Sequence, residues 1–400
     1  MGESERLAID GGHPVREKFL IFGSPDIREP EIQEVVEALR GGWPGTGPRV
    51  ARFEEAFRAY IGCRHAVALN SCTAGLHLSM IALGVKPGDE VITTPLTFVA
   101  TVNSIIHVGG RPVFADVDRR TMNVDPRAVA AAVTGKTRAI VPVHFAGRPC
   151  DMTAIEAIAR PRGIRILEDA AHAVEASHAG RKIGTIGDCT AFSFYVNKNM
   201  ITVEGGMVTT DSDEIASWVK IAGLHGMSKD AWKRFGDEGY RHYLVHFPGF
   251  KYNMMDMQAA IGLHQLGRVE EGWRRRREIW DRYQAAFADL PAILPAPPDP
   301  GDRHAHHLFT ILADTDNLKV PRDTVLTALQ AENIGTGVHY TAVHLHPYYR
   351  ETFGFARGDF PNAEFISDRT ISIPFSTKLT DADADDVIRG VRKVFTAYAR

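Results

Sequence analysis

The chain has 400 residues, of which 44% are hydrophobic and 24% charged, and its formal net charge is −3. A chain of this length and composition can form two domains that share a large buried core. The near-neutral charge, without a basic stripe or tail, gives no reason to expect nucleic acid or an anionic membrane as a partner. The N-terminal sequence lacks the apolar core of a signal peptide and no window reaches membrane-spanning length, so we expect a cytoplasmic protein.

Two surface and redox features are unremarkable in the sequence. The four cysteines, Cys63, Cys72, Cys150 and Cys189, form neither a C-x-x-C pair nor a disulfide framework, so we expect free thiols. The basic run from Arg274 to Arg277 lies in a helical pattern, and we interpret it as a solvated helix face or a subunit contact.

Seven short apolar runs rich in β-branched residues occur between residues 64 and 210, and most are separated by segments of helical length. The runs are 65–70, 89–96, 111–117, 138–144, 164–170, 189–195 and 205–210. This alternation predicts an α/β fold with a wound sheet, whose ligands bind beyond the carboxyl ends of the strands. The polar residues that we expect at this edge are Asn70, Thr97, His144, Asp169 and Lys198.

The pattern changes after residue 256. Residues 257–290 form one long helical pattern that ends at the breaker-rich sequence PAILPAPPDPGD. We interpret residues 1–265 as a large domain and residues 266–400 as a smaller C-terminal α/β domain begun by a long linking helix. Strand and helix character alternate in its segments 307–314, 320–334 and 335–341, and an amphipathic helix over 381–400 closes the chain.

One lysine and one aspartate stand out among the strand ends. Lys198 lies between the run ending at Ser193 and a Glu-Gly-Gly turn, and Asp169 ends another run 29 residues earlier. Alone, Lys198 is typical of a surface lysine and Asp169 of a helix cap. Together they are the pair that pyridoxal phosphate requires, because the carboxylate keeps the pyridine nitrogen protonated and the amine forms a Schiff base. Burial near the cationic ring lowers the pKa of such a lysine and frees it for imine exchange.

The sequence NSCTAGLHLSMIAL, which begins at Asn70, offers a site for the phosphate of that cofactor. A strand that ends at Asn70 and a helix that starts near Thr73 place free backbone N–H groups and the positive helix end at one point. Such residues are more often an ordinary helix cap. Here the turn lies at the same predicted edge as Asp169 and Lys198, and Ser193 can add a hydroxyl to the same phosphate.

From about residue 20 to residue 395 the chain resembles the DegT/DnrJ/EryC1/StrS family of PLP-dependent nucleotide-sugar aminotransferases. The resemblance rests on SCTAGLHL, GDEVITTPLTFVATVNSI, PVHFAG, LEDAAHA, FSFYVNKN with EGG, LHG, PGFKYNMMDMQAAIGLHQL and NIGTGVHY, in the family's order. It implies the fold type I aminotransferase architecture, in which the large domain holds a mostly parallel seven-stranded sheet. It also implies pyridoxal 5'-phosphate as cofactor and a homodimer with a shared active site.

The resemblance implies roles for residues around the cofactor. Lys198 would carry the internal aldimine, Asp169 would pair with the pyridine nitrogen, and His172 would stand near the phenolic oxygen. Phe98 would lie over the pyridine ring. Without the family, Phe98 is more typical of the core and His172 is equally typical of a buried, hydrogen-bonded histidine.

The resemblance also implies contacts to the phosphate and the substrate. Thr73 and Ala74 would give backbone amides to the phosphate, Ser193 its hydroxyl, and Asn253 would reach the phosphate from the neighbouring subunit. His339 and Tyr340, in the segment that borders the sugar pocket in the family, would contact the substrate. A further trio, His304, His306 and His307, lacks an acid or thiol at ligand spacing, so we expect no metal site.

Within the family, HPYYRETFGF and NIGTGVHY are similar to enzymes that aminate C4 of a nucleotide-linked keto sugar, especially the UDP-4-amino-4-deoxy-L-arabinose aminotransferase. Glutamate would be the amino donor. The opening LAIDGGHPVR instead resembles relatives that act on aminocyclitol or amino-benzoate precursors, so a 3-keto sugar or keto-cyclitol stays open as acceptor. A sugar dehydratase of the same fold and a non-catalytic regulator are further alternatives, although such dehydratases have His where this chain has Lys198.

One residue departs from the family pattern. Val203 precedes EGG, where Gly is commoner. Because a β-branched residue does not easily adopt a positive φ, we expect this turn to use an ordinary backbone conformation.

Overall fold

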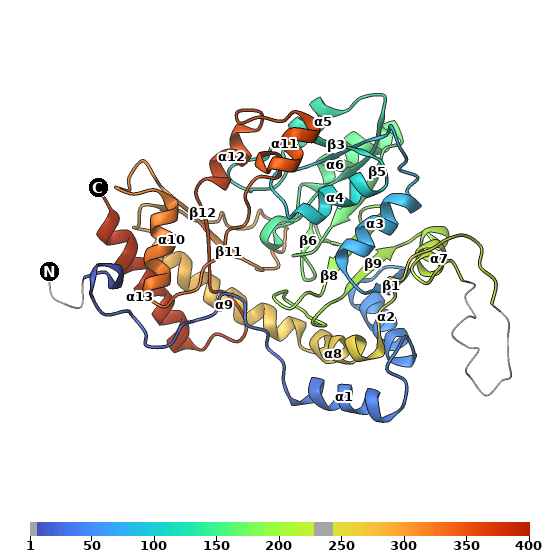
Figure 1. The fold of residues 1–400 in the computed structure, drawn as a ribbon, viewed down its shortest axis with the longest axis horizontal. Helices are drawn as coiled ribbons and strands as arrows, with labels where there is room; N and C mark the ends of the chain where they lie inside the picture. Colours follow the sequence, from blue (N-terminus) through green and yellow to red (C-terminus); the bar gives the residue numbers. More distant parts are fainter. Residues whose placement is uncertain (1–5, 228–242) are drawn as a thin grey trace.

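The structure, a computed structural model, describes residues 6–227 and 243–400. A seven-stranded sheet lies at its centre, with the strand order β1-β9-β8-β5-β4-β2-β3 (Figure 1). The strands are β1 His65–Leu69, β2 Glu90–Thr93, β3 Arg111–Phe114, β4 Thr137–Val141, β5 Arg165–Asp169, β8 Cys189–Ser193 and β9 Gly206–Thr210. All seven predicted strands are confirmed, and so is the predicted α/β class.

The sheet is mostly parallel. Strand β9 pairs antiparallel with both β1 and β8, and the other neighbouring strands pair parallel. The carboxyl ends of the six strands other than β9 therefore lie along one edge, which is where ligands bind in wound sheets.

Helices cover both faces of this sheet, because alternate residues of each strand point to opposite sides. On one face α3 (Cys72–Ala82), α4 (Val99–His107) and α7 (Asp213–Ala222) pack on strand residues such as Leu69 and Val141. The other face is covered by α2 (Pro48–Ile61), α5 (Pro126–Ala132), α6 (Met152–Ala159) and α8 (Asp256–Gly267). The amphipathic helix α1 (Glu29–Arg40) lies along α8 (Figure 1).

The long helical pattern of residues 257–290 forms two helices rather than one. Helix α8 ends at Gly267 and α9 runs over Val269–Phe287, with the break at Arg268, whose φ is −118° and ψ 12°. The basic run is also more varied than expected. Arg277 is exposed, but Arg276 is only 2% exposed and pairs with the buried Glu175, so the interpretation as a solvated face is wrong for Arg276.

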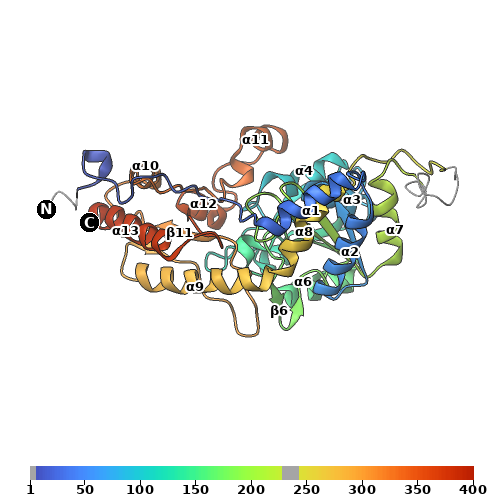
Figure 2. The ribbon, with the colours of Figure 1, turned by 90° about the horizontal axis from the view of Figure 1, so that it is seen from below.

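A second, antiparallel sheet of three strands lies beside α9, in the part of the molecule away from the main sheet (Figure 2). Its strands are β10 Ala292–Ile293, β11 Phe309–Ala313 and β12 Thr370–Ile373. They share a hydrophobic core with α9, α10 (Arg322–Ala331) and α13 (Asp381–Tyr398), the last of which confirms the predicted C-terminal helix. The boundary that we placed between residues 265 and 266 stays a prediction.

The remaining elements are short. Helices α11 (Pro347–Phe353) and α12 (Pro361–Ser367) precede β12, and β6 (Ser177–His178) pairs with β7 (Arg181–Lys182). Segment 335–341 is not a strand as its sequence suggested, since only Gly337 forms a bridge, to Ser372. All four cysteines are free thiols, as expected. None of the helices in the described residues has the length and apolar character needed to cross a membrane.

Candidate active site

A cavity of about 580 Å³ opens at the carboxyl edge of the main sheet. The residues around it come from the ends of β1, β5 and β8, from the start of α4 and from segment 338–340. Eight of the ten predicted site residues line it: Thr73, Phe98, Asp169, His172, Ser193, Lys198, His339 and Tyr340. Ala74 and Asn253 do not.

Lys198 lies in the loop between β8 and β9. Its backbone N–H donates to the carbonyl of Tyr195 over 2.9 Å, which closes a tight turn and directs the residue to the cavity. Burial lowers the pKa of its amine to about 8, although Cys72 and Asp169 act in the opposite direction. The neutral, nucleophilic form of this amine is therefore far more populated near neutral pH than that of an ordinary lysine.

Asp169 ends β5 and is buried in the cavity wall. Its Oδ2 accepts a hydrogen bond from Thr101 Oγ1 over 2.7 Å, and its Oδ1 accepts one from the Ala171 N–H over 3.1 Å. Burial raises the pKa of this carboxyl, while the two hydrogen bonds and Lys198 lower it. No Lys, Arg or His of the described chain forms an ion pair with it, so a cationic N–H of a ligand would complete its surroundings.

The start of α3 meets the cavity beside Lys198. The N-cap Ser71 accepts a hydrogen bond from the Ala74 N–H over 3.1 Å, which leaves the earlier amides of the first turn facing the cavity. The Ala74 N–H, which we expected to donate to the phosphate, thus already donates to the Ser71 side chain. Gly206 makes this junction possible, because a Cβ there would lie 2.5 Å from the Cys72 nitrogen.

His172 and Tyr340 are hydrogen-bonded to each other. The Ala146 N–H donates to His172 Nδ1 over 3.2 Å, and His172 Nε2 lies 3.2 Å from the Tyr340 hydroxyl. Burial lowers the pKa of His172 well below its usual value, so the ring is neutral and carries its proton on Nε2. His172 therefore donates to Tyr340, and the tyrosine proton is free to point elsewhere.

Phe98 and His339 lie at the rim of the cavity. Phe98 is 60% exposed, so it is not a core residue, and its ring centroid lies 6.2 Å from that of Tyr340. His339 is held by a 2.9 Å contact between its Nδ1 and Ser372 Oγ.

The prediction for Val203 is wrong, because its φ is +69°. The neighbouring turn explains this conformation. Thr202 Oγ1 donates to the Glu204 carbonyl over 2.7 Å, and Gly205 and Gly206 approach Thr202 and the start of α3 too closely for a side chain. The close packing of this turn therefore accompanies a φ at Val203 that β-branched residues rarely adopt.

Asn253 lies at a second opening, of about 770 Å³, which Trp43, Asn70 and Lys251 also line. Its amide donates to Thr46 Oγ1 over 2.6 Å and accepts from Lys251 Nζ over 2.5 Å. Within one subunit it does not reach the cavity of Lys198, so its predicted role depends on a second subunit and stays a prediction.

Several cavity residues were not singled out from the sequence. Thr101 was missed although it lies on the helix after Phe98, and Asn197 although it adjoins Lys198. The three histidines lie in two places. His304 and His306 stack on each other and pack in a tilted arrangement against Trp280, whereas His307 lines the cavity. In the parts of the chain that are described, no cluster of three or more His, Cys, Asp or Glu side chains is arranged to hold a metal ion.

Comparison with known proteins identifies the family. The model of the DegT/DnrJ/EryC1/StrS aminotransferase family matches residues 25–392. The chain belongs to this family. It is 52% identical over 381 residues to the spore coat polysaccharide biosynthesis protein SpsC of Bacillus subtilis, covering 95% of this chain and 98% of SpsC.

Solved structures agree with this membership. The putative sugar aminotransferase Spr1654 of Streptococcus pneumoniae, in its PMP-form, superposes with a TM-score of 0.88 at 32% identity, covering 95% of this chain and 98% of that one. PseC of Helicobacter pylori, an aminotransferase of pseudoaminic acid biosynthesis, also gives 0.88, at 27% identity and with 96% and 100% covered. The chain is therefore a PLP-dependent sugar aminotransferase of fold type I, and the dehydratase and regulator alternatives are not retained.

The residues of the cavity fit that cofactor. The buried carboxylate of Asp169 without a cationic partner suits a protonated pyridine nitrogen, and the amine of Lys198 suits the cofactor's aldehyde. The exposed first-turn amides of α3 and the hydroxyl of Ser193 suit a phosphate.

Proposed function

We propose that this aminotransferase moves the amino group of glutamate to the C4 keto group of a nucleotide-linked sugar. The observation that carries the proposal is the presence, in one cavity, of both the Lys198 amine and the buried Asp169 carboxylate. The nucleotide is supported by the relative DesI, whose structure was determined in the presence of its TDP-sugar product and which is 32% identical to this chain. The likeness to SpsC suggests that the amino sugar enters a polysaccharide.

The side chains have distinct tasks in this reaction. Pyridoxal phosphate, when bound, supplies an aldehyde for the amine and a ring that accepts electrons from the reacting carbon. Asp169, oriented by Thr101, holds a proton on the ring nitrogen. Lys198, whose pKa of about 8 lies close to neutral pH, removes the proton from Cα of the amino donor.

The substrate side of the cavity suits a sugar. Tyr340 receives a hydrogen bond from His172 and can donate its own proton to a sugar oxygen, and the exposed ring of Phe98 offers an apolar surface beside it. His339 lies at the same rim. We therefore retain His339 and Tyr340 as substrate contacts.

A panel assay tests the substrate. Purified holoenzyme is mixed with glutamate and with UDP-, GDP- and dTDP-linked 4-keto and 3-keto sugars and a keto-cyclitol, and 2-oxoglutarate is measured. We expect turnover with a nucleotide-linked 4-keto sugar and none for Lys198→Ala. Turnover confined to the 3-keto sugar or to the keto-cyclitol would overturn the C4 assignment, and activity with another amino donor alone would overturn glutamate.

We further propose that the enzyme is a homodimer in which Asn253 completes the active site of the partner. The large opening around Asn253 holds Lys251, which has no carboxylate partner within the described chain, and the exposed Met255. An opening with a free cation and exposed apolar side chains suits contact with a second subunit.

Mixing two inactive variants tests this arrangement. Lys198→Ala and Asn253→Ala subunits are unfolded together, refolded at equal amounts and assayed. Random pairing restores one complete site in half of the dimers, which gives about a quarter of wild-type activity. Full activity of Asn253→Ala alone, or no recovery from a mixture of two inactive variants, would contradict the shared site.

A further inference from the structure

A second, smaller chamber of about 40 Å³ lies behind Lys198. Its walls come from residues 22–26 of the N-terminal segment, from helices α8 and α9, and from residues 375–377 after β12. A further wall is the lysine loop, residues 194–205 between β8 and β9. Most of the lining is polar. Asn197, Lys198 and His307 line both this chamber and the active-site cavity. The lysine loop is thus the partition between them.

Two residues of this lining carry buried polar atoms that lack a hydrogen-bond partner in the structure. One is the Nε–H of Arg276, a donor, and the other is Oδ1 of Asn197, an acceptor. Buried polar groups in folded proteins almost always have a partner, either protein or ordered water. A donor and an acceptor at one small chamber call for a partner that both accepts and donates, which is the property of water.

The chamber is large enough for such a molecule and unsuited to an ion. One water needs about 10–15 Å³ of such space. The guanidinium of Arg276 is already paired with the buried carboxylate of Glu175, so this arginine does not require an anion in the chamber. Asp26, which also lines the chamber, is paired with Arg268 and Arg28, so it is not free for a cation.

Arg276 also positions Asn199, the residue that follows Lys198 in the chain, through Glu175. Glu175 accepts from Arg276 through Oε1 and from the Asn199 amide through Oε2, the latter over 3.0 Å. Asn199 also donates to the Ala305 carbonyl over 2.9 Å. Asn199 is therefore fixed to α9 by a direct chain of hydrogen bonds.

We propose that the chamber holds an ordered water that bridges Arg276 Nε and Asn197 Oδ1. Both sequence neighbours of Lys198 are then tied to one buried arginine, Asn199 through Glu175 and Asn197 through the water. Arg276 becomes a positioning residue that fixes the loop of the catalytic lysine on α9. This role does not depend on which sugar the enzyme accepts.

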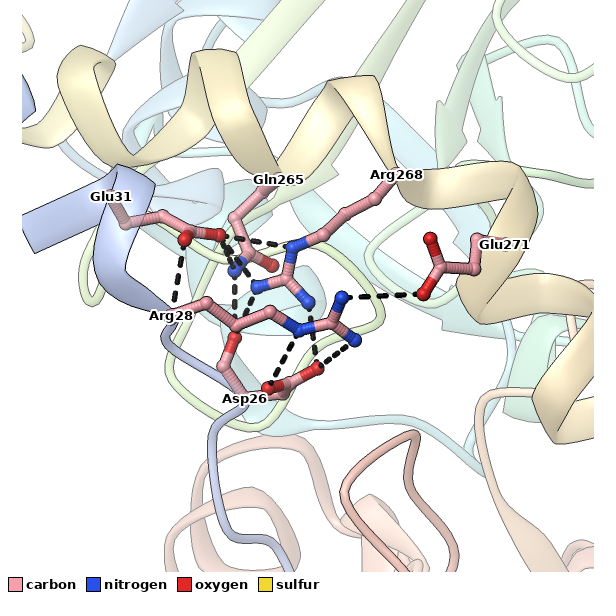
Figure 3. A network of polar contacts seen from close by, with 6 residues as sticks. All are labelled: Asp26, Arg28, Glu31, Gln265, Arg268 and Glu271. Atoms are coloured by element: carbon pink, nitrogen blue, oxygen red, sulfur yellow. Dashed lines mark hydrogen bonds and ion pairs between the residues drawn. The ribbon is translucent and has the colours of Figure 1, made fainter.

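The N-terminal segment closes the chamber. Gly23 packs against Asn197, because a Cβ on Gly23 would lie 3.1 Å from the Asn197 Cβ. Asp26 and Gln265, two further lining residues, belong to the polar network of Figure 3, in which Arg268 donates to Asp26 Oδ2 and to Glu31 Oε1, each over 2.6 Å. This network holds the segment over the chamber.

Crystallography of the holoenzyme tests the site directly. We expect a density peak within hydrogen-bond distance of both Arg276 Nε and Asn197 Oδ1 in the wild type, and its loss or displacement in Asn197→Leu. A chamber without density in the wild type, or with density that does not contact both atoms, would overturn the water site.

Hydrogen–deuterium exchange of the holoenzyme tests the positioning role. In Asn197→Leu and in Arg276→Lys, which keeps the charge beside Glu175, we expect peptides that cover residues 195–201 to exchange roughly five- to tenfold faster, with kcat lowered and KM nearly unchanged. Arg277→Lys, the exposed neighbour on α9, is the matched control. Exchange and kcat equal to those of the control would overturn the role of the water, and if Arg276→Lys does not fold, Asn197→Leu alone decides.

Discussion

Thr101 Oγ1 donates a 2.7 Å hydrogen bond to Asp169 Oδ2, and this contact orients the carboxylate that we expect to pair with the cofactor's ring nitrogen. Thr101 itself contacts Thr97 Oγ1 over 2.9 Å, so its hydroxyl has a defined orientation. Burial raises the pKa of Asp169 above its ordinary value, and this hydrogen bond opposes that rise. A carboxylate that stays ionised is needed to keep the ring nitrogen protonated.

Thr101→Val keeps the shape of the side chain and removes this donor. We expect the fold and cofactor binding to persist and kcat to fall about tenfold, which corresponds to the loss of one hydrogen bond to a charged group. Ser104→Ala on the same helix, whose hydroxyl donates only to the Ala100 carbonyl, is the control. Steady-state kinetics with unchanged kcat in Thr101→Val would remove Thr101 from this role.

The buried amine of Lys198 should lower the free energy of unfolding of the apoenzyme, and the size of this cost should depend on pH. Its pKa is about 8 in the folded chain and 10.5 in the reference state, so the native state resists protonation. The cost is fully present below about pH 8 and disappears as the pH rises toward 10.5, because only there is the unfolded lysine also neutral. Lys198→Met should therefore be more stable than wild type at pH 7, by at most roughly 3 kcal/mol, and by less at pH 10.

Urea unfolding of the two apoenzymes at pH 7 and pH 10 measures this difference. The comparison uses apoenzyme because bound cofactor stabilises the wild type by mass action. A difference in free energy of unfolding that does not shrink at the higher pH would contradict the lowered pKa of Lys198.

The main sheet and the Lys198–Asp169 pair were predictable because they follow from local pattern. Short β-branched runs separated by helical segments define parallel strands, and the carboxyl ends of such strands meet at one edge. The two residues end or follow β5 and β8, which are adjacent in the sheet, so their proximity follows from topology.

Features that depend on distant partners were not predictable. The helical periodicity of residues 257–290 carries no sign of the break at Arg268, because the acids that bind this arginine, Asp26 and Glu31, lie more than 230 residues away. The positive φ of Val203 likewise occurs in a turn whose Gly206 packs closely against the start of α3. His307 lines the cavity from the residues just before β11, and the local pattern of segment 307–314 does not show that it lies beside the carboxyl edge of the main sheet.

The strained backbone of Val203 predicts a stabilising substitution. A non-glycine residue at φ +69° costs about 1–3 kcal/mol, part of which glycine's greater freedom in the unfolded chain offsets. Val203→Gly should raise the free energy of unfolding by about 1 kcal/mol in the same apoenzyme assay. Val133→Gly, at an ordinary φ of −66°, is the matched control and should lower it by a similar amount. Equal destabilisation by both substitutions would contradict strain at Val203.

The network around Arg268 predicts a contribution to stability that acid removes. Burial raises the pKa of both Asp26 and Glu31. Hydrogen bonds from arginines lower it by more: Asp26 accepts from Arg28 and Arg268, and Glu31 accepts from Arg268. Both carboxyls therefore have a lowered pKa. Such groups stabilise the fold above their unfolded pKa of about 4, and this contribution is lost as the pH falls through the folded values. Glu31 is 1% exposed, so the loss of its arginine leaves a buried charge underpaired.

Arg268→Gln should therefore lower the free energy of unfolding at pH 7 by roughly 2–4 kcal/mol. At pH 3 the difference from wild type should be smaller, because the unfolded chain then binds protons on these carboxyls and the ion pairs of the wild type lose part of their contribution. Arg282→Gln, which breaks only surface pairs with Asp381 and Asp385, should change the free energy by less than about 1 kcal/mol at either pH. A deficit of Arg268→Gln that is equally large at pH 3 would show that packing of the arginine stem, rather than its ion pairs, joins α1 to the junction of α8 and α9.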